Sequence, residues 1–289
     1  MRTRFNHRFW LVVLALISVN GDSRAQSSTD SSAATPPPGY KLVWADEFSQ
    51  DPDGLPDPAK WSYEEGFIRN HESQYYTKAR KENARIENGQ LIIEARKENY
   101  VYDATLDHES IPAHYTSAAL ETVGKADWQY GRIEVKAKLP AGKGTWPAIW
   151  TLGSNIKQVG WPRCGEIDIM ELVGKQPGII HGTLHYFTND KAQSSGGQIT
   201  IAQPDQTFHV YAAEWTPERI DLFVDDKKYV SFDINKATES GENPFRKPHF
   251  LILNLALGGT WGGLIDDSIL PQRMTVDYVR VYQKTLSSP

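Results

Sequence analysis

The run GEIDIMELVG carries the clearest chemical pattern of the sequence, because three acidic residues stand close together among apolar neighbours. Glu166 and Asp168 are two residues apart, so they share one face of a β-strand. Glu171 is five residues from Glu166 and would point to the opposite face of a regular strand. A β-bulge near Ile169 and Met170 adds one residue, and it would return Glu171 to the face of the other two.

Two carboxyl groups held roughly 5–5.5 Å apart are the apparatus of a retaining glycosidase. One carboxylate attacks the anomeric carbon, and the other protonates the leaving oxygen and then activates water. Like charges this close cannot all stay ionised, so one carboxyl group should have a raised pKa. We expect Asp168 to hydrogen-bond Glu166, to fix its orientation and to help keep Glu171 protonated.

Two other interpretations of the three acids stay open. They could be solvated carboxylates on a charged edge strand, or they could form a calcium site. The isoleucines between the acids argue against the edge strand, because apolar side chains need a covered face.

Aromatic residues close to this strand in the sequence predict a sugar-binding groove. Trp146, Trp150 and Trp161 precede the acids, and indole rings stack on pyranose faces as well as packing in cores. His181 and His185 share a face of a strand-like run, where His185 could line the groove or serve a structural role.

Composition excludes several classes of protein. With 39% hydrophobic and 23% charged residues, the 289-residue chain can form a core and is not globally disordered. A formal net charge of −5 argues against a protein that coats nucleic acid or anionic lipid. The single cysteine excludes an intrachain disulfide, and no His-Glu-x-x-His motif indicates a zinc hydrolase.

The N-terminal residues 1–25 resemble a secretory signal peptide, with three early arginines, the apolar run FWLVVLALI and the cleavage-type sequence Ser-Arg-Ala. An uncleaved membrane anchor is the alternative. The Ser- and Pro-rich residues 26–38 have the composition of a linker. We expect a folded domain over 39–285 and a secreted or periplasmic mature protein that is not held in a membrane.

Most of the domain alternates apolar and polar residues with period two, which predicts an all-β fold. Asn88-Gly89 is a strong hairpin signal before the strand at 91–95. Further strands are expected at 132–139, 208–215, 219–224, 228–232, 250–257 and 275–282. Many short strands with Gly, Pro and Asn turns predict a sandwich or β-jelly-roll of two curved antiparallel sheets, with a concave substrate cleft.

The acidic hexamer 166–171 resembles the bulged Glu-x-Asp-x-x-Glu signature of glycoside hydrolase family 16. Further blocks agree in order from about residue 41 to 283, and the branch most similar is that of the laminarinase-type endo-β-1,3-glucanases. These blocks are WADEF at 44–48, QYYT at 74–77, YTSA at 115–118, YGR at 130–132, WPAIW at 146–150, HGTLH at 181–185, NLALGG at 254–259 and VDYVRVY at 276–282.

The resemblance implies a concanavalin A-like jelly roll and a monomeric enzyme that acts on β-glucan without a catalytic cofactor. Glu166 would be the nucleophile, Glu171 the acid/base and Asp168 the assisting acid. Sugar contacts are implied for Asn70, Trp146, Trp150, Trp161, His185 and Trp261. A structural calcium ion on the convex side is implied at Glu47, the carbonyl group of Gly89 and Asp277.

Three segments depart from the family pattern. Ala119 follows the YTSA block where many members have Arg, residues 66–72 are less Gly-rich than usual, and 189–197 form an unusual polar loop. We expect these loops to border the groove, where linkage preference is set.

Other activities of the same family remain as alternatives: a hydrolase of another polysaccharide such as a galactan or xyloglucan, or a transglycosylase. A non-catalytic glucan-binding module is a further alternative. Xyloglucan-active relatives usually have the unbulged spacing, and loss of either Glu would mark a binding module. This chain has the bulged spacing and both glutamates.

Overall fold

The computed structural model describes residues 35–49, 53–102 and 112–285. The fold described below is that of the compact unit Pro36–Pro289, within the described residues. The expected signal peptide at 1–25 and most of the linker lie outside the described residues. Within the described part, no helix combines the length and the apolar character needed to cross a membrane.

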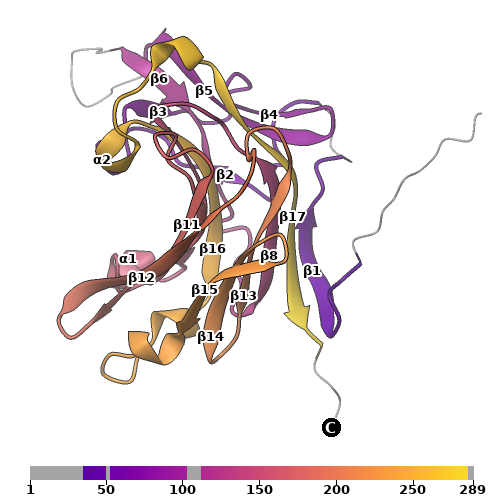
Figure 1. Cartoon of the computed structure of the whole chain (residues 1–289), viewed down its shortest axis with the longest axis vertical. Coiled ribbons are helices and arrows are strands. Elements are labelled where there is room, and N and C mark those ends of the chain that lie inside the picture. Colours follow the sequence, from indigo (N-terminus) through magenta and orange to yellow (C-terminus); the bar gives the residue numbers. More distant parts are fainter. Residues whose placement is uncertain (1–34, 50–52, 103–111, 286–289) are drawn as a thin grey trace, which may run out of the picture. The chain divides into compact units, whose positions relative to one another are not determined.

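Two β-sheets build this unit, as the sequence pattern predicted (Figure 1). The ten-stranded sheet has the order β15-β14-β13-β8-β17-β5-β6-β3, with β1 also paired to β17 and β4 to β5. Its strands are β1 (Tyr40–Asp46), β3 (Gln74–Tyr76), β4 (Ala84–Glu87), β5 (Gln90–Tyr100), β6 (Ala113–Ser117), β8 (Gly131–Lys138), β13 (His209–Trp215), β14 (Arg219–Val224), β15 (Lys227–Asp233) and β17 (Gln272–Lys284).

The seven-stranded sheet has the order β12-β11-β10-β9-β16-β7-β2. Its strands are β2 (Ser62–Tyr63), β7 (Ala119–Glu121), β9 (Thr145–Gly153), β10 (Glu166–Glu171), β11 (Ile179–Thr188), β12 (Lys191–Thr200) and β16 (His249–Leu257). Short helices connect the strands: α1 (Ile156–Val159), α2 (Gly259–Gly262), η1 (Ile234–Ala237), η2 (Pro244–Arg246) and η3 (Asp267–Ile269).

The alternation of the sequence decides which side chains enter the core. Along β8 every second residue is buried, so that Ile133, Val135 and Ala137 face the other sheet. They join a cluster that includes Ile167 and Leu184 of the seven-stranded sheet. Burial of one such aliphatic side chain stabilises the fold by about 1.5–3 kcal/mol, and the cluster therefore holds the two sheets together.

The hairpin and the central strand were predicted correctly. Asn88 and Gly89 both have positive φ angles, 53° and 72°, as a type I′ turn between β4 and β5 requires. All nine residues of β16 are buried, and β16 lies between β9 and β7, so the apolar run is a covered inner strand.

The prediction of a polar loop at 189–197 was wrong. Only Asn189 and Asp190 form the turn, and both have positive φ angles. Lys191–Thr200 is strand β12, paired residue by residue with β11 from Thr188↔Lys191 to Ile179↔Thr200. Ser, Gln and Gly have low strand propensity, so the local sequence did not indicate a strand; the ladder to β11 imposes it. The hairpin extends the seven-stranded sheet, which curves strongly (Figure 1).

Candidate active site

Strand β10 contains the β-bulge that the acidic pattern predicted. On the β9 side, Asp168 pairs with Trp150 and Met170 with Ile149, so that Ile169 has no partner. On the β11 side, the register also shifts between Asp168 and Glu171. The extra residue of the bulge is therefore Ile169, beside the three acids.

The bulge turns consecutive side chains to the same face. Ile169 and Met170 are both fully buried in the core between the sheets, together with Ile167. The acidic side chains point to the other face, where Glu166, Asp168 and Glu171 all line one cleft. The predicted common face of the three acids is thus confirmed, and the idea of a solvated edge strand is wrong because β10 lies between β9 and β11.

Two tryptophans hold the outer carboxyl groups. The indole Nε1 of Trp161 donates a hydrogen bond to Glu166 Oε2 at 2.9 Å. The indole Nε1 of Trp146 donates to Glu171 Oε1, also at 2.9 Å. Each hydrogen bond stabilises the ionised carboxylate and restricts its rotation. The two glutamates are therefore held in orientation from opposite ends of the acidic strand.

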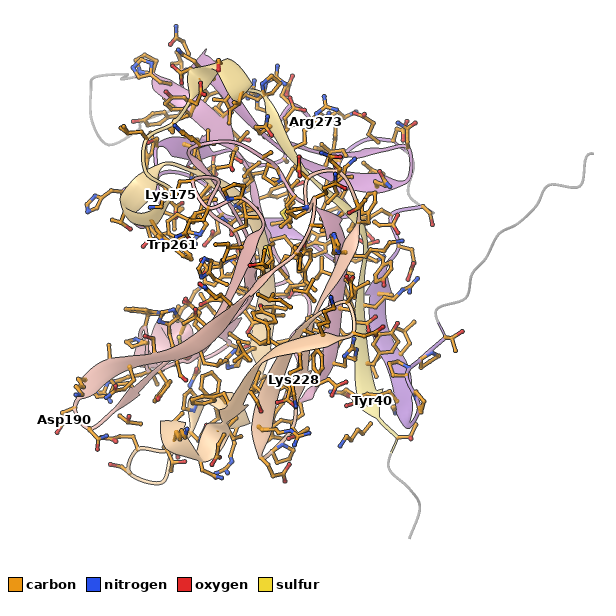
Figure 2. All side chains as sticks on the ribbon, viewed as in Figure 1. Tyr40, Lys175, Asp190, Lys228, Trp261 and Arg273 are labelled. Carbon is orange, nitrogen blue, oxygen red and sulfur yellow. The ribbon has the colours of Figure 1, made fainter. Side chains whose placement is uncertain are left out.

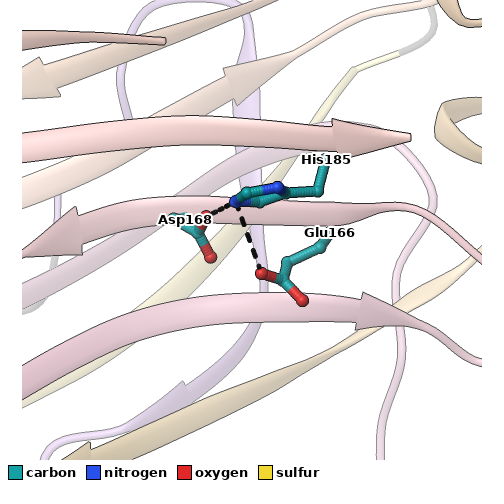
Figure 3. Close-up of side chains that lie close together, drawn as sticks. All are labelled: Glu166, Asp168 and His185. Carbon is teal, nitrogen blue, oxygen red and sulfur yellow. Dashed lines mark ion pairs between the residues drawn. The ribbon is translucent and has the colours of Figure 1, made fainter. Parts of the chain in front are cut away.

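His185 lies on the neighbouring strand β11 and faces the first two acids (Figure 3). Its Nε2 lies 3.2 Å from Asp168 Oδ2 and 3.8 Å from Glu166 Oε1. The histidine thus faces Glu166 and Asp168 from the side of β11, but it is not among the residues that line the cleft.

Burial is the largest influence on the titration of the acids. It raises the pKa of Glu166 to about 8, with the nearby Asp168 raising it further and His185 and the Trp161 N–H opposing the rise. Burial likewise raises the pKa of Glu171 to about 7, opposed by the Trp146 N–H. Burial and the neighbouring Glu171 charge hold the pKa of Asp168 well above its usual range. Burial thus favours the protonated forms of these groups, which suits an acid catalyst, while His185 and the Trp161 N–H favour ionisation of Glu166.

The cleft above the acids has a volume of about 450 Å³. Carboxyl, amide and indole groups all line this space, and such a mixture of polar groups and aromatic rings suits a sugar unit. Its lining residues are Glu64, Ile68, Arg69, Asn70, Glu72, Trp146, Ala148, Trp150, Leu152, Ile156, Trp161, Glu166, Asp168, Glu171 and Asn254.

The expected sugar-binding residues occupy different places. Asn70, Trp146, Trp150 and Trp161 line the cleft. Trp161 is 55% exposed, so its ring is free to stack on a substrate. Trp261 lies within α2 at the concave side of the fold (Figure 2) and packs edge-on against Trp146 with ring centroids 5.4 Å apart. It also contacts the His181 ring, so it reaches the acids through Trp146.

Trp150 is held more tightly than the sequence indicated. It is only 7% exposed, and the Arg69 guanidinium lies over its ring, 4.9 Å from the centroid. Arg69 in turn pairs with Glu64. A cation over an indole face takes the place that a sugar ring would use. Trp150 therefore forms the wall of the cleft, while Arg69 presents polar groups to it.

Sequence reasoning missed a polar network on the wall of the cleft. Trp150 donates to Asn254 Oδ1 at 2.8 Å, Asn254 donates to the Tyr76 hydroxyl at 2.9 Å, and that hydroxyl donates to Glu72 Oε2 at 3.1 Å. Glu72 also accepts from Asn70 at 3.2 Å. The blocks that contain these residues were noted as family-like, but nothing local showed that they meet.

One group of side chains in the described ranges could hold a metal ion: ligand atoms of Glu166, Asp168 and His185 lie within 4.8 Å of one another. The residues expected to bind structural calcium lie elsewhere. Glu47 accepts two hydrogen bonds from Arg280, at 2.7 and 2.8 Å. Asp277 pairs with Lys136 at 2.9 Å. Both carboxylates thus have protein cations as partners.

Comparison of the sequence with known proteins gives a consistent result. The model of glycosyl hydrolases family 16 matches residues 71–280. The chain is 45% identical to a beta-glucanase of Rhodothermus marinus over 287 residues, which cover 95% of this chain and 93% of that protein.

Solved structures agree with the sequence comparison. The X-ray structure of the laminarinase from Rhodothermus marinus superposes with a TM-score of 0.76 at 47% identity, covering 85% of this chain and 98% of that one. A mutant of SCLam, a non-specific endo-β-1,3(4)-glucanase co-crystallised with a glucan oligosaccharide, superposes with a TM-score of 0.76 at 46% identity. This second alignment covers 86% of this chain and 96% of the SCLam chain.

Proposed function

The chain belongs to glycosyl hydrolases family 16, and from that membership we propose that it cleaves internal bonds of β-1,3-glucan and of mixed β-1,3/1,4-glucan. It is a glycoside hydrolase of the laminarinase type. The observation that carries the proposal is the bulge in β10, which brings two indole-anchored glutamates and Asp168 to one face of a single cleft.

In the proposed first step, the ionised Glu166 attacks the anomeric carbon. The bond from that carbon to the leaving oxygen breaks, and Glu171 gives its proton to this oxygen. The burial that raises the pKa of Glu171 to about 7 favours a carboxyl group that carries a proton to donate. The product is a glycosyl ester on Glu166.

In the second step, Glu171 removes a proton from a water molecule, which attacks the same carbon and releases Glu166. Two inversions give overall retention of configuration. Only carboxyl groups and water exchange bonds and protons, so catalysis in this family requires no cofactor. The separation of the two glutamates, roughly 5–5.5 Å for this mechanism, stays a prediction.

Asp168 and His185 are proposed to assist Glu166. Asp168 is almost fully buried, and His185 lies within 3.2 Å of it and 3.8 Å of Glu166. The histidine and the Trp161 N–H both favour the ionised form of Glu166, against the cost of burial. Together they oppose the rise in the pKa of Glu166 and so increase the fraction of the nucleophile that is ionised and able to attack.

Substrate binding is proposed for the rest of the cleft. The exposed ring of Trp161 offers a stacking surface beside Glu166. Asn70 offers its amide to sugar hydroxyl groups, held by Glu72. Trp146 and Trp150 shape the wall, and Trp261 supports Trp146.

Activity on two polymers tests the proposed function. We expect the purified protein to release new reducing ends from laminarin and, at a different rate, from barley-type mixed-linkage glucan. Oligosaccharides of several lengths should appear early, because cleavage is internal. A galactan such as agarose serves as the control and should give no release. If neither glucan gave new reducing ends, while the control or another β-linked polymer did, the proposed substrate would be contradicted.

Export and state of assembly are also part of the proposal. We propose that residues 1–25 are a cleaved signal peptide, that 26–38 are a linker, and that 39–285 form the catalytic domain of a secreted or periplasmic monomer. Mass spectrometry of the exported protein should find Gln26 as its first residue, and size exclusion should give the mass of one chain. A membrane-bound protein that keeps Met1 would contradict it.

A structural calcium ion is proposed on the convex side, at Glu47, the Gly89 carbonyl group and Asp277. In support, Gln90, which follows Gly89, donates to Asp277 at 3.4 Å, and a Cβ built at Gly89 would lie 3.2 Å from the backbone of Ser49, two residues after Glu47. Carboxylate and carbonyl oxygens are the ligands that calcium prefers. To bind it, Glu47 and Asp277 would have to exchange Arg280 and Lys136 for the ion.

Removal of calcium tests this site. We expect about 1 mM calcium to raise the melting temperature by roughly 5 °C over EDTA, because an ion that binds only the folded state stabilises it. Asp277→Asn should abolish the shift, whereas the exposed Asp266→Asn should keep it. Equal melting of the natural protein in calcium and in EDTA would show that Arg280 and Lys136 alone balance these carboxylates.

A further inference from the structure

The bulge in β10 interrupts the regular strand pairing at Ile169. Ile169 has no register partner in β9, and the ladder to β11 passes from Asp168 directly to Glu171. The Ile169 side chain is fully buried. A buried carbonyl group without a donor is costly, so the bulge needs a donor from outside its own sheet.

Tyr229 supplies that donor. Its hydroxyl group donates to the Ile169 carbonyl oxygen at 2.6 Å, and the His181 carbonyl oxygen lies 3.4 Å away. Tyr229 belongs to β15 of the ten-stranded sheet, so the hydrogen bond crosses from one sheet to the other. Figure 1 shows β15 beside β11, and the two strands are in contact.

Gly182 makes room for this contact. A Cβ atom at Gly182 would lie 2.5 Å from the Tyr229 hydroxyl oxygen and 2.9 Å from its ring. No side chain other than hydrogen therefore fits at this point of β11. The tyrosine hydroxyl reaches the back of the acidic strand through the gap that the glycine leaves.

We propose that Tyr229 is a positioning residue, which fixes the bulge from behind and so sets the place of Glu171 relative to Glu166. This inference rests on the proposed function. Glu166 precedes the bulge and keeps regular partners on both sides, Leu152 and His185. Glu171 follows the bulge, so any change of the bulge moves it and leaves Glu166 in place.

Loss of the Tyr229 hydroxyl group should therefore slow protonation of the leaving oxygen by Glu171 more than it slows attack by Glu166. Glu171 must place its proton on the leaving oxygen, and small misplacements of a catalytic group cost large factors in rate. A leaving group that departs as a stable anion does not need this proton. Substrates with and without such a leaving group separate the acid function of Glu171 from attack by Glu166.

The test compares Tyr229→Phe with the natural protein on laminarin and on 2,4-dinitrophenyl β-laminaribioside. Phenylalanine keeps the ring and removes only the hydroxyl group. We expect kcat/KM on laminarin to fall roughly 10- to 100-fold with KM changed less than about twofold. On the activated substrate we expect a fall of less than about threefold, because no proton is required.

Tyr211→Phe is the matched control. Tyr211 is a fully buried tyrosine of the same sheet, and its hydroxyl group has no hydrogen-bond partner in the part of the chain that the structure describes. Its loss should leave both kcat/KM values unchanged. Equal losses on both substrates for Tyr229→Phe, or values equal to those of the control, would overturn the inference.

A second variant approaches the same contact from the other side. Gly182→Ala keeps the hydroxyl group but displaces it, and it should give the same larger loss on laminarin than on the activated substrate. This variant decides the question if Tyr229→Phe does not fold, and an equal loss on both substrates would again overturn the proposal. Inactivity of the natural protein on laminarin would instead contradict the proposed function, so the two failures are distinguishable.

Discussion

Glu166→Gln is expected to reduce release of reducing ends from laminarin by roughly 10⁴-fold or more, because an amide cannot form the glycosyl ester. The fold should remain, since the amide oxygen still accepts the hydrogen bond that Trp161 donates to Glu166. Assays of reducing ends and thermal melts followed by circular dichroism measure both results. Retention of a few per cent of the activity would place the nucleophile elsewhere.

The same variant should change how stability depends on pH. Burial raises the pKa of Glu166 to about 8 from 4.5, so its protonated form stabilises the folded state, and this contribution is lost as the pH rises through 8. Gln cannot ionise, so Glu166→Gln should melt at the same temperature as the natural protein at pH 4 and at a higher temperature at pH 9. A lower melting temperature at pH 9 would contradict this.

Chemical rescue identifies the role of Glu166. Glu166→Ala leaves a space in which azide can attack the anomeric carbon of 2,4-dinitrophenyl β-laminaribioside. Because attack then occurs once, from the face that Glu166 occupied, the product should be the α-glycosyl azide. A β-glycosyl azide would mean that the vacated position is that of the acid/base.

Glu171→Gln is expected to have the second largest effect. Hydrolysis of laminarin should fall by roughly 10²–10⁴-fold, the usual contribution of a general acid or base. Cleavage of the dinitrophenyl substrate to the glycosyl-enzyme should survive, because its leaving group needs no proton. With azide present this variant should form the β-glycosyl azide, since the nucleophile remains and two inversions occur.

The pH profile gives an independent measure of the same role. Burial raises the pKa of Glu171 to about 7, so the group loses its proton, and the enzyme its acid, as the pH rises through 7. The active form has Glu166, with a pKa of about 8, ionised and Glu171 protonated, so kcat/KM for laminarin should peak between about pH 7 and 8 and decline at higher pH. Glu171→Gln should remove this alkaline decline.

Glu121→Gln is the control for the pH experiment. Burial raises the pKa of Glu121 to about 7 as well, but this residue does not line the cleft. The variant should keep the alkaline decline of the natural enzyme. If it abolished the decline and Glu171→Gln did not, the assignment of the acid/base would be wrong.

What the sequence determined by itself was local. The spacing of Glu166, Asp168 and Glu171 predicted a bulge. Side chains alternate between the two faces of a strand, so residues five positions apart, such as Glu166 and Glu171, share a face only if an extra residue is inserted between them. Asn88-Gly89 predicted its hairpin because only a few residue types accept two positive φ angles. Resemblance across many blocks added the family and with it the roles of the three acids.

Tertiary structure alone decided how distant residues meet. Three contacts of this kind join residues that are 81 to 233 positions apart in the sequence. Arg69 lies over the Trp150 ring, Asn254 donates to Tyr76 in the chain of hydrogen bonds that leads to Glu72, and Arg280 pairs with Glu47. The Tyr229 contact with Ile169 spans 60 positions and crosses two sheets. No local periodicity carries such information, because it depends on the register of strands that are remote in sequence.

The same reason explains the error at 189–197. Its polar and glycine residues have little strand propensity of their own, and the ladder to β11 makes them a strand. The acids were thus predictable as a set from their spacing. Sequence analysis also placed Trp146 and Trp161 near the acids, but their hydrogen bonds to Glu171 and Glu166, the burial of the acids and the Tyr229 hydroxyl group behind the bulge became visible only in the folded structure.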